Sequence, residues 1–222
     1  QPAAADPAQP DRVVLGLVLA SVLAHGRVRG VTFFRAVLFL PQTVATVVVA
    51  IAWVWIYAPD GPLNAALDAV GLSGISRGWL GDFNFALPAL GLVGTWVMFG
   101  LCLVLFLAGI QKIPYSLYEA ARVDGAGRVR EFFAVTLPGL RGELAVALTL
   151  TTIMALRTFD LIYVSTSGGP GTSTTVPSVL VYQNAFVNGR VGLAAAVAVV
   201  LTALIFVVAF AITRLVDRDP SR

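Results

Sequence analysis

Few side chains in this sequence could do chemistry, and two of them interrupt an apolar stretch. Arg157 and Asp160 lie three positions apart, which places them on one face of a helix. Ionisable groups inside an apolar span are costly, so they usually face a cavity or one another. We therefore expect this pair either to line a polar pathway or to form a paired charge near the outer interface that sets the helix position.

The sequence offers little material for a metal centre or a catalytic triad. His25 is the sole histidine and Cys102 the sole cysteine, which excludes His-pair motifs and makes a cysteine-built metal site improbable. A phosphate-binding GxxxxGK[ST] loop is absent, and Lys112, the one lysine, lacks its glycines. We predict a chain that is not an enzyme, with no catalytic residue, metal or cofactor of its own.

The composition indicates a membrane protein. Of 222 residues, 58% are hydrophobic and 12% are charged, whereas soluble domains carry about 25% charge. The 15 basic and 12 acidic residues give a net charge of +3. Because the basic residues are spread between apolar runs, we expect them to set topology and expect no nucleic-acid partner.

The apolar runs have the length of membrane-spanning helices. We predict an all-α, polytopic membrane helical bundle with four full spans and one partial span, the latter at about 13–25, after a flexible tail at 1–12. The runs are not alternating ten-residue strands, which argues against a β-barrel. The four full spans are expected at about 36–58, 87–109, 143–164 and 191–213.

The basic residues are distributed asymmetrically between the two sides of this bundle. If 25–35 is cytoplasmic, the segments on that side hold eleven Arg or Lys residues, against two in the loops 59–82 and 165–190. Positive residues favour the cytoplasmic side. We therefore predict that the loop at 112–141 and the C-terminus are cytoplasmic.

The loop at 112–141 carries a pattern of short helices. Pro114 can start a helix, and Asp124-Gly125 can end it, because glycine suits the left-handed cap. A second short helix is expected at 128–135, since Pro138 disfavours helix just before itself. The result is a helix–Gly–helix projection from the membrane, with small alanines that permit close approach of a partner.

The spacing within this loop resembles a family signature. Glu119-Ala120-Ala121, three residues, Gly125, nine residues, Val135, one residue and Leu137-Pro138 resemble the EAA motif of permease subunits in bacterial binding-protein-dependent ABC importers. Four further stretches are similar to the carbohydrate-uptake branch of that family. They are GVTFFRAVLFLP at 30–41, WLGDFNFALPAL at 79–90, LFLAGIQKIP at 105–114 and FDLIYVSTSGGPGTST at 159–174.

The resemblance implies the type I ABC importer permease fold in a bacterial plasma membrane. It implies four kinds of partner: a second permease subunit, cytoplasmic ATPase subunits that bind ATP-Mg, an extracytoplasmic solute-binding protein and the lipid bilayer. The solute would be a small sugar, and the energy would come from the separate ATPase.

The resemblance also assigns roles to individual residues. Glu119 would meet a basic group of the ATPase, Ala120 and Ala121 would pack in its groove, and Gly125 would allow the bend. Asp124, Leu137 and Pro138 belong to the same motif.

A second group of residues is predicted to lie along the solute pathway. Arg157 and Asp160 would contact it, and Phe159, Tyr163 and Trp96 could stack on a sugar. Packing or a place in the aromatic belt is the alternative for these three rings.

Other functions stay open at this point. The chain could be a permease of the same family for a non-sugar solute, or a secondary transporter driven by an ion gradient. Family members usually have six spanning helices, so we also expect the first helix and part of the second to be missing, through truncation or a wrongly assigned start.

Overall fold

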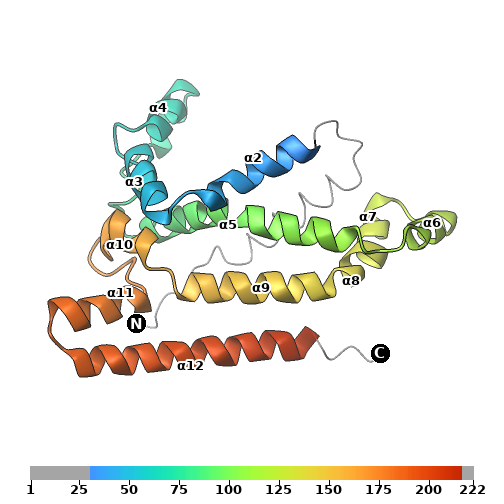
Figure 1. Ribbon diagram of the computed structural model, residues 1–222. Coiled ribbons are helices and arrows are strands. Elements are labelled where there is room, and N and C mark those ends of the chain that lie inside the picture. Colours follow the sequence, from blue (N-terminus) through green and yellow to red (C-terminus); the bar gives the residue numbers. More distant parts are fainter. Residues whose placement is uncertain (1–30, 217–222) are drawn as a thin grey trace.

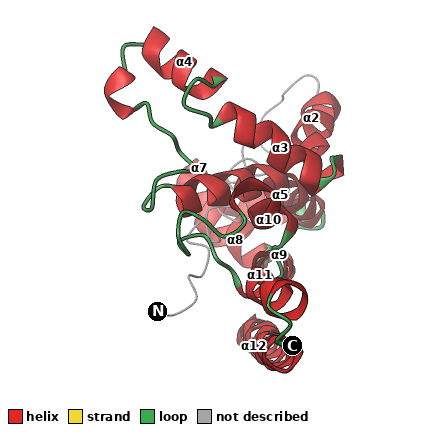
Figure 2. Ribbon diagram, turned by 90° about the vertical axis from the view of Figure 1, so that its left-hand side faces the viewer, coloured by secondary structure: helices red, strands yellow, loops and turns green. Residues whose placement is uncertain are grey.

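The computed structural model describes residues 31–216, and every regular element in that range is a helix. This confirms the predicted all-α fold (Figures 1 and 2). The tail predicted at 1–12 and the partial span predicted at 13–25 lie outside the described residues.

Three long helices form the frame of the described part. They are α5 (Ala86–Ile110), α9 (Arg141–Leu156) and α12 (Val191–Val216). Figure 1 shows them running side by side, with α12 packed mainly along α9 and along the short α11 (Pro177–Tyr182). Within the described range, α5, α9 together with the helix that follows it, and α12 are long and apolar enough to cross a membrane.

The stretch predicted as one tilted span at 36–58 is sharply bent, and it counts as one span only if its two helices are taken together. It forms two helices, α2 (Val31–Thr43) and α3 (Thr46–Ile56), whose axes differ by 108°. Pro41 removes a backbone donor from the last turn of α2 and its ring crowds the preceding turn, which weakens the helix at this point. The break therefore falls where the chain holds a helix least well.

The span predicted at 143–164 is also divided into two helices. The first, α9, ends at Leu156, and α10 (Asp160–Thr166) begins after a break of three residues. Arg157 is the C-cap of α9 and Asp160 the first residue of α10. The expectation that these two residues share one helical face is wrong. Helix dipoles explain their positions, because a cation is stabilised at a helix C-terminus and an anion at an N-terminus.

The loop at 112–141, called the α6 loop below, contains an unbroken helical run after its turn. It holds α6 (Tyr115–Val123), α7 (Arg128–Glu131), the π-helical η2 (Phe132–Thr136) and α8 (Leu137–Gly139). Pro138 does not end the second helix, contrary to prediction. The wider π turn bonds the Leu137 N–H to the Phe132 carbonyl, which relieves the clash between a proline ring and the preceding helical turn.

A small lobe at the other end of the bundle is built around Asn64. It contains α4 (Pro62–Ala69) and η1 (Ser73–Ile75). The buried Asn64 amide donates to the carbonyls of Ala58, Pro59 and Arg77, and its oxygen accepts from the Trp79 indole at 2.9 Å.

Two hydrophobic clusters make up the core, and α5 contributes to both. One cluster joins α3, α10 and α11 to the first half of α5 through residues such as Ala50, Leu90 and Ile162. The other joins the second half of α5 to α9, through Leu103 and Ala147 among others. The two helix breaks lie between these clusters, so the polar residues at the breaks are held between two packed regions.

Candidate functional site

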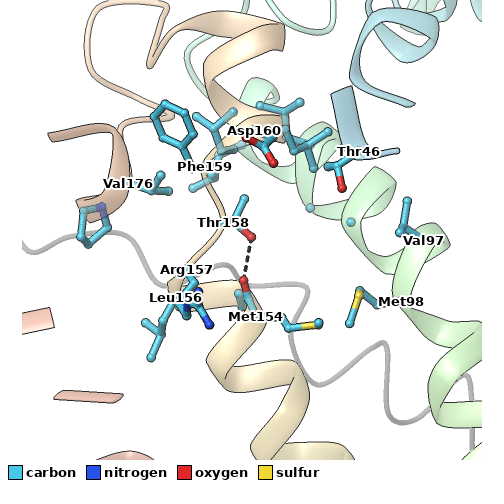
Figure 3. A pocket seen from close by; sticks show the side chains of 18 of the residues that line it. Thr46, Val97, Met98, Met154, Leu156, Arg157, Thr158, Phe159, Asp160 and Val176 are labelled. Carbon is cyan, nitrogen blue, oxygen red and sulfur yellow. Dashed lines mark hydrogen bonds between the residues drawn. The ribbon is translucent and has the colours of Figure 1, made fainter. Parts of the chain in front are cut away.

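A cavity of about 400 Å³ lies where both helix breaks meet α5. Broken helices expose backbone groups and polar side chains, which are tolerated within a membrane only where they are buried in protein or line a cavity. Figure 3 shows residues from both breaks and from α5 turned around this space. Its lining includes Gln42, Val44 and Thr46 from the first break, Arg157, Thr158, Phe159 and Asp160 from the second, and Leu90, Gly91, Gly94, Val97 and Met98 from α5.

Several polar groups in this cavity lack partners among the described residues. The Gln42 Oε1 atom is buried and accepts no hydrogen bond there. Arg157 and Asp160 are exposed at the cavity, and neither forms an ion pair within residues 31–216. A mostly apolar cavity with a few convergent polar groups is the usual form of a small-molecule site.

The structure brings together three of the five residues predicted for the solute pathway. Arg157, Phe159 and Asp160 line the cavity, whereas Tyr163 and Trp96 are not part of its lining. Tyr163 stacks on the Phe159 ring at 5.0 Å, and Trp96 meets Trp53 edge-on at 5.7 Å. The geometry therefore gives Tyr163 and Trp96 packing partners, and a contact of either ring with solute remains a prediction.

Sequence reasoning missed Gln42 and Thr46. It treated 36–58 as an uncharged span and gave its polar residues no role. The available signal was a cluster of polar residues, Gln42, Thr43 and Thr46, directly after Pro41 in a run that is otherwise apolar.

The α6 loop presents part of its predicted motif at the surface. Glu119 and Ala120 are exposed on α6, and Ala121 is half-buried. Gly125 has φ +75°, and the Ala126 N–H donates to the Ala121 carbonyl at 2.9 Å, which together close α6 with a left-handed cap. The predicted conformation of Gly125 is confirmed.

The remaining motif residues lie in different parts of the same loop. Asp124 is exposed beside the Gly125 turn. Leu137 and Pro138 belong to α8, next to the start of α9 and away from the α6 tip (Figure 1). The motif therefore divides into an exposed tip and a base, and a role of either in coupling remains a prediction.

Internal contacts hold the two limbs of the α6 loop together. Arg122 donates two hydrogen bonds to Glu131, at 2.9 and 3.1 Å, and this carboxylate partner raises the pKa of Arg122. The buried Tyr118 hydroxyl lies 3.2 Å from the Thr136 hydroxyl. At the base, Lys112 forms an ion pair with Glu143 at 3.0 Å.

Curated relatives cover most of this chain. A probable ABC transporter permease protein of Bacillus subtilis, YurN, is 41% identical over 188 residues, or 84% of this chain and 64% of its own length. The trehalose/maltose transport system permease protein MalF of Thermococcus litoralis is 39% identical over 193 residues, covering 86% of this chain and 64% of its own length. The diacetylchitobiose uptake system permease protein NgcF of Streptomyces coelicolor is 37% identical over 217 residues, covering 93% and 61%. The chain thus spans somewhat over three fifths of the length of these relatives.

Solved structures share the fold. A chain in the crystal structure of a bacterial ABC transporter involved in the import of alginate superposes with a TM-score of 0.81 at 23% identity, covering 98% of this chain and 79% of that one. A second structure of a bacterial alginate ABC transporter, in complex with a periplasmic protein that carries an alginate pentasaccharide, gives a TM-score of 0.79 at 24% identity and covers 95% and 76%. The likeness at this identity supports the fold.

A family model identifies the chain more directly than any single relative. The model described as the binding-protein-dependent transport system inner membrane component matches residues 12–222, which is nearly the whole sequence. The helices long and apolar enough to cross a membrane agree with that description. The chain belongs to the family of inner membrane components of binding-protein-dependent transport systems.

Proposed function

We propose that this chain is the membrane-spanning permease subunit of an ATP-driven importer that translocates a sugar or a related solute. A solute-binding protein would deliver the solute, a second permease subunit would complete the pathway, and separate ATPase subunits would bind ATP-Mg and supply the energy. This chain would then hydrolyse nothing and hold no cofactor.

The cavity between the two helix breaks is the observation that carries this proposal. A polyhydroxylated solute needs hydrogen-bond donors and acceptors in place of water. The side chains of Gln42, Arg157 and Asp160 provide both donors and acceptors at the cavity. Arg157, Asp160 and the Gln42 oxygen have no protein partner among the described residues. Solute hydroxyls are suitable partners for these groups.

The sugar class is supported by what similar proteins are named for. MalF of Thermococcus litoralis is named for trehalose and maltose, and NgcF for diacetylchitobiose. The proposed solute is therefore a saccharide, translocated through a pathway that includes Arg157, Phe159 and Asp160.

The α6 loop is proposed as the contact with the ATPase. The helix that carries the exposed Glu119 and Ala120, α6, lies at the end of the bundle opposite α4 (Figure 1). The excess of basic residues on the α6 side supports a cytoplasmic position for this loop and the C-terminus under the positive-inside rule. Movement of the ATPases would then reach the cavity through α5 and α9.

Reconstitution with its ATPase tests the coupling. Glu119→Lys and Gly125→Pro are each expected to reduce co-purification of the ATPase at least about tenfold, because a reversed charge or a blocked left-handed turn removes the docking surface. Asp68→Lys, the same charge reversal in the Asn64 lobe, is the matched control and should leave co-purification unchanged. Full co-purification and uptake in both loop variants would refute the proposed contact.

A transport assay in proteoliposomes tests the energy source and the solute. Uptake of radiolabelled maltose, trehalose and diacetylchitobiose should require ATP on the side of the membrane that carries the ATPase. Uptake should persist when ionophores collapse the ion gradients. Uptake that follows an ion gradient without ATP would instead establish a secondary transporter. ATP-dependent uptake of amino acids or phosphate, with no saccharide transported, would overturn the sugar assignment.

A further inference from the structure

Arg122 is placed to tie the two limbs of the α6 loop together. Its guanidinium donates through Nε to Glu131 Oε2 at 2.9 Å and through Nη2 to Glu131 Oε1 at 3.1 Å. Its third donor, Nη1, reaches the Tyr115 hydroxyl at 3.1 Å. A two-point contact of this kind fixes orientation as well as distance, because both groups are planar. One side chain thus connects the start of α6, its end and α7.

The two partners differ in their exposure. The Glu131 side chain is 6% exposed, whereas that of Arg122 is 47% exposed. A buried carboxylate without a cation is strongly unfavourable, so α7 is held where Arg122 can reach Glu131. The contact therefore restrains the position of α7 against α6, across the turn that contains Gly125 and Gly127.

Further contacts continue this restraint toward the membrane. The hydroxyls of Tyr118 and Thr136, both buried, are 3.2 Å apart and join α6 to η2. At the base Gly139 lies directly against Ile113, since a Cβ built on this glycine would be 2.6 Å from Ile113 Cδ1. The loop is thus connected at its tip, its middle and its base.

Glu119 differs from Glu131 although both are acidic residues of the same loop. Glu119 is exposed, while Glu131 is 4% exposed and bonded to Arg122. The family motif contains Glu119 but not Arg122 or Glu131. A surface contact and an internal support are therefore separable in this loop, and each can be changed without altering the other.

We propose that Arg122 and Glu131 are positioning residues that make the α6 loop a stiff lever between the ATPase and the bundle. This inference rests on the proposed function, in which the ATPase contacts α6. With the contact intact, displacement of α6 moves α7, α8 and the start of α9 together. Without the Arg122–Glu131 contact, α6 still carries its docking surface but can rotate about the glycine-containing turn. Part of the displacement of α6 is then not transmitted to α7, α8 and α9.

Hydrogen exchange on the full chain in detergent tests the stiffness. Arg122→Gln and Glu131→Gln should each speed amide exchange in residues 115–131 by about tenfold. The reason is that loss of a contact within a network can raise the local opening equilibrium by up to about two factors of ten. The exchanged pair Arg122→Glu with Glu131→Arg should recover most of the protection. Arg130→Gln, which removes an exposed cation from α7, is the control and should change nothing.

Transport per ATP in the reconstituted importer tests the lever. The two single variants should retain co-purification of the ATPase and ATP hydrolysis while solute moved per ATP falls about fivefold, and the exchanged pair should recover at least half of the loss. A general folding defect would instead reduce co-purification and hydrolysis together.

Three results would overturn the inference. Solute moved per ATP could remain normal in both single variants, or it could fall no further in them than in Arg130→Gln. The exchanged pair could also recover none of the exchange protection. If the unaltered chain binds no ATPase, the proposed function fails and this inference fails with it. Measuring ATPase binding by the unaltered chain therefore distinguishes that outcome from failure of the inference alone.

Discussion

Three polar side chains of the α6 loop and three of the cavity differ in whether they have partners. In the loop Arg122, Glu131 and Lys112 all have charged partners at hydrogen-bonding distance. In the cavity Arg157, Asp160 and Gln42 Oε1 lack such partners among the described residues. Paired groups stiffen a structure, whereas unpaired groups in a cavity can be satisfied by a ligand. The contrast separates a part suited to transmit force from a part suited to hold a solute.

A comparison of two amide side chains gives the largest expected effect. Asn64→Leu should lower the free energy of unfolding of the Asn64 lobe by about 3 kcal/mol, because it removes the donor from the carbonyl groups of Ala58, Pro59 and Arg77 and the acceptor from the Trp79 indole. Gln42→Leu should leave stability within about 0.5 kcal/mol, because the Gln42 oxygen accepts no bond among the described residues. Hydrogen exchange and thermal unfolding in detergent measure both. Equal losses in the two variants would contradict the distinction.

The packing between α5 and α9 should be nearly as sensitive. Gly109→Ala should cost about 2 kcal/mol, because its Cβ would lie 2.5 Å from Leu140 Cδ2 and 2.7 Å from Glu143 Cγ. Gly142→Ala is the matched control, since nothing lies within 4 Å of its Cβ. The melting temperature measures the difference. A neutral Gly109→Ala would show that α9 can move away from α5 freely, which is incompatible with a stiff base for the α6 loop.

Substitution of Arg157 should change transport while leaving the stability of the fold unchanged. Arg157→Gln should change the free energy of unfolding by less than about 0.5 kcal/mol, since no ion pair is lost, yet reduce saccharide uptake about tenfold. Asp160→Asn should behave similarly. Arg190→Gln, which removes an exposed arginine just before α12, serves as the control. Normal uptake by both cavity variants would remove these charges from the pathway.

The smallest effect is expected at the base of the α6 loop. Lys112 is 74% exposed, and its pair with Glu143 is therefore screened by solvent. Lys112→Gln should cost about 0.5 kcal/mol, and the loss should shrink further in 0.5–1 M salt, as roughly expected for exposed pairs. Melting temperatures of both proteins at low and high salt measure this. A loss of stability as large as that of Gly109→Ala would mean that the Lys112–Glu143 pair is shielded from solvent.

The sequence predicted the helical class and the family, but it could not predict where helices break. Long apolar runs and the spacing around Glu119 and Gly125 are local signals, and the helices and the left-handed turn follow from them. The bend after Thr43 and the separation of Arg157 from Asp160 depend on packing between distant segments, such as α3 against α10. The cavity exists only because of these breaks, so the polar cluster after Pro41 could not by itself assign a role to Gln42.

The ion pair inside the α6 loop could likewise not be predicted from the sequence. Arg122 and Glu131 are nine residues apart, beyond the reach of contacts within one helix, and they meet because the chain reverses at Gly125. Glu119 is conspicuous in the sequence because it belongs to a recognisable motif. Burial, which distinguishes the two glutamates, is a property of the folded loop.

The π-helical segments have a consequence for how this chain tolerates insertions and deletions. Both η2 and η3 (Gln183–Val187) contain one residue more than an α-helical turn requires, since the bonds to the Phe132 and Gln183 carbonyls each span five residues. Removing one residue from η2 would convert it to an α-helix and rotate α7 by about 100° relative to α8. Arg122 and Glu131 both precede the deleted residue, so α6 and α7 would turn together relative to α8. A one-residue gap at this place in an alignment is therefore equivalent to a change in the direction of the α6 tip, although no residue of the tip itself is altered.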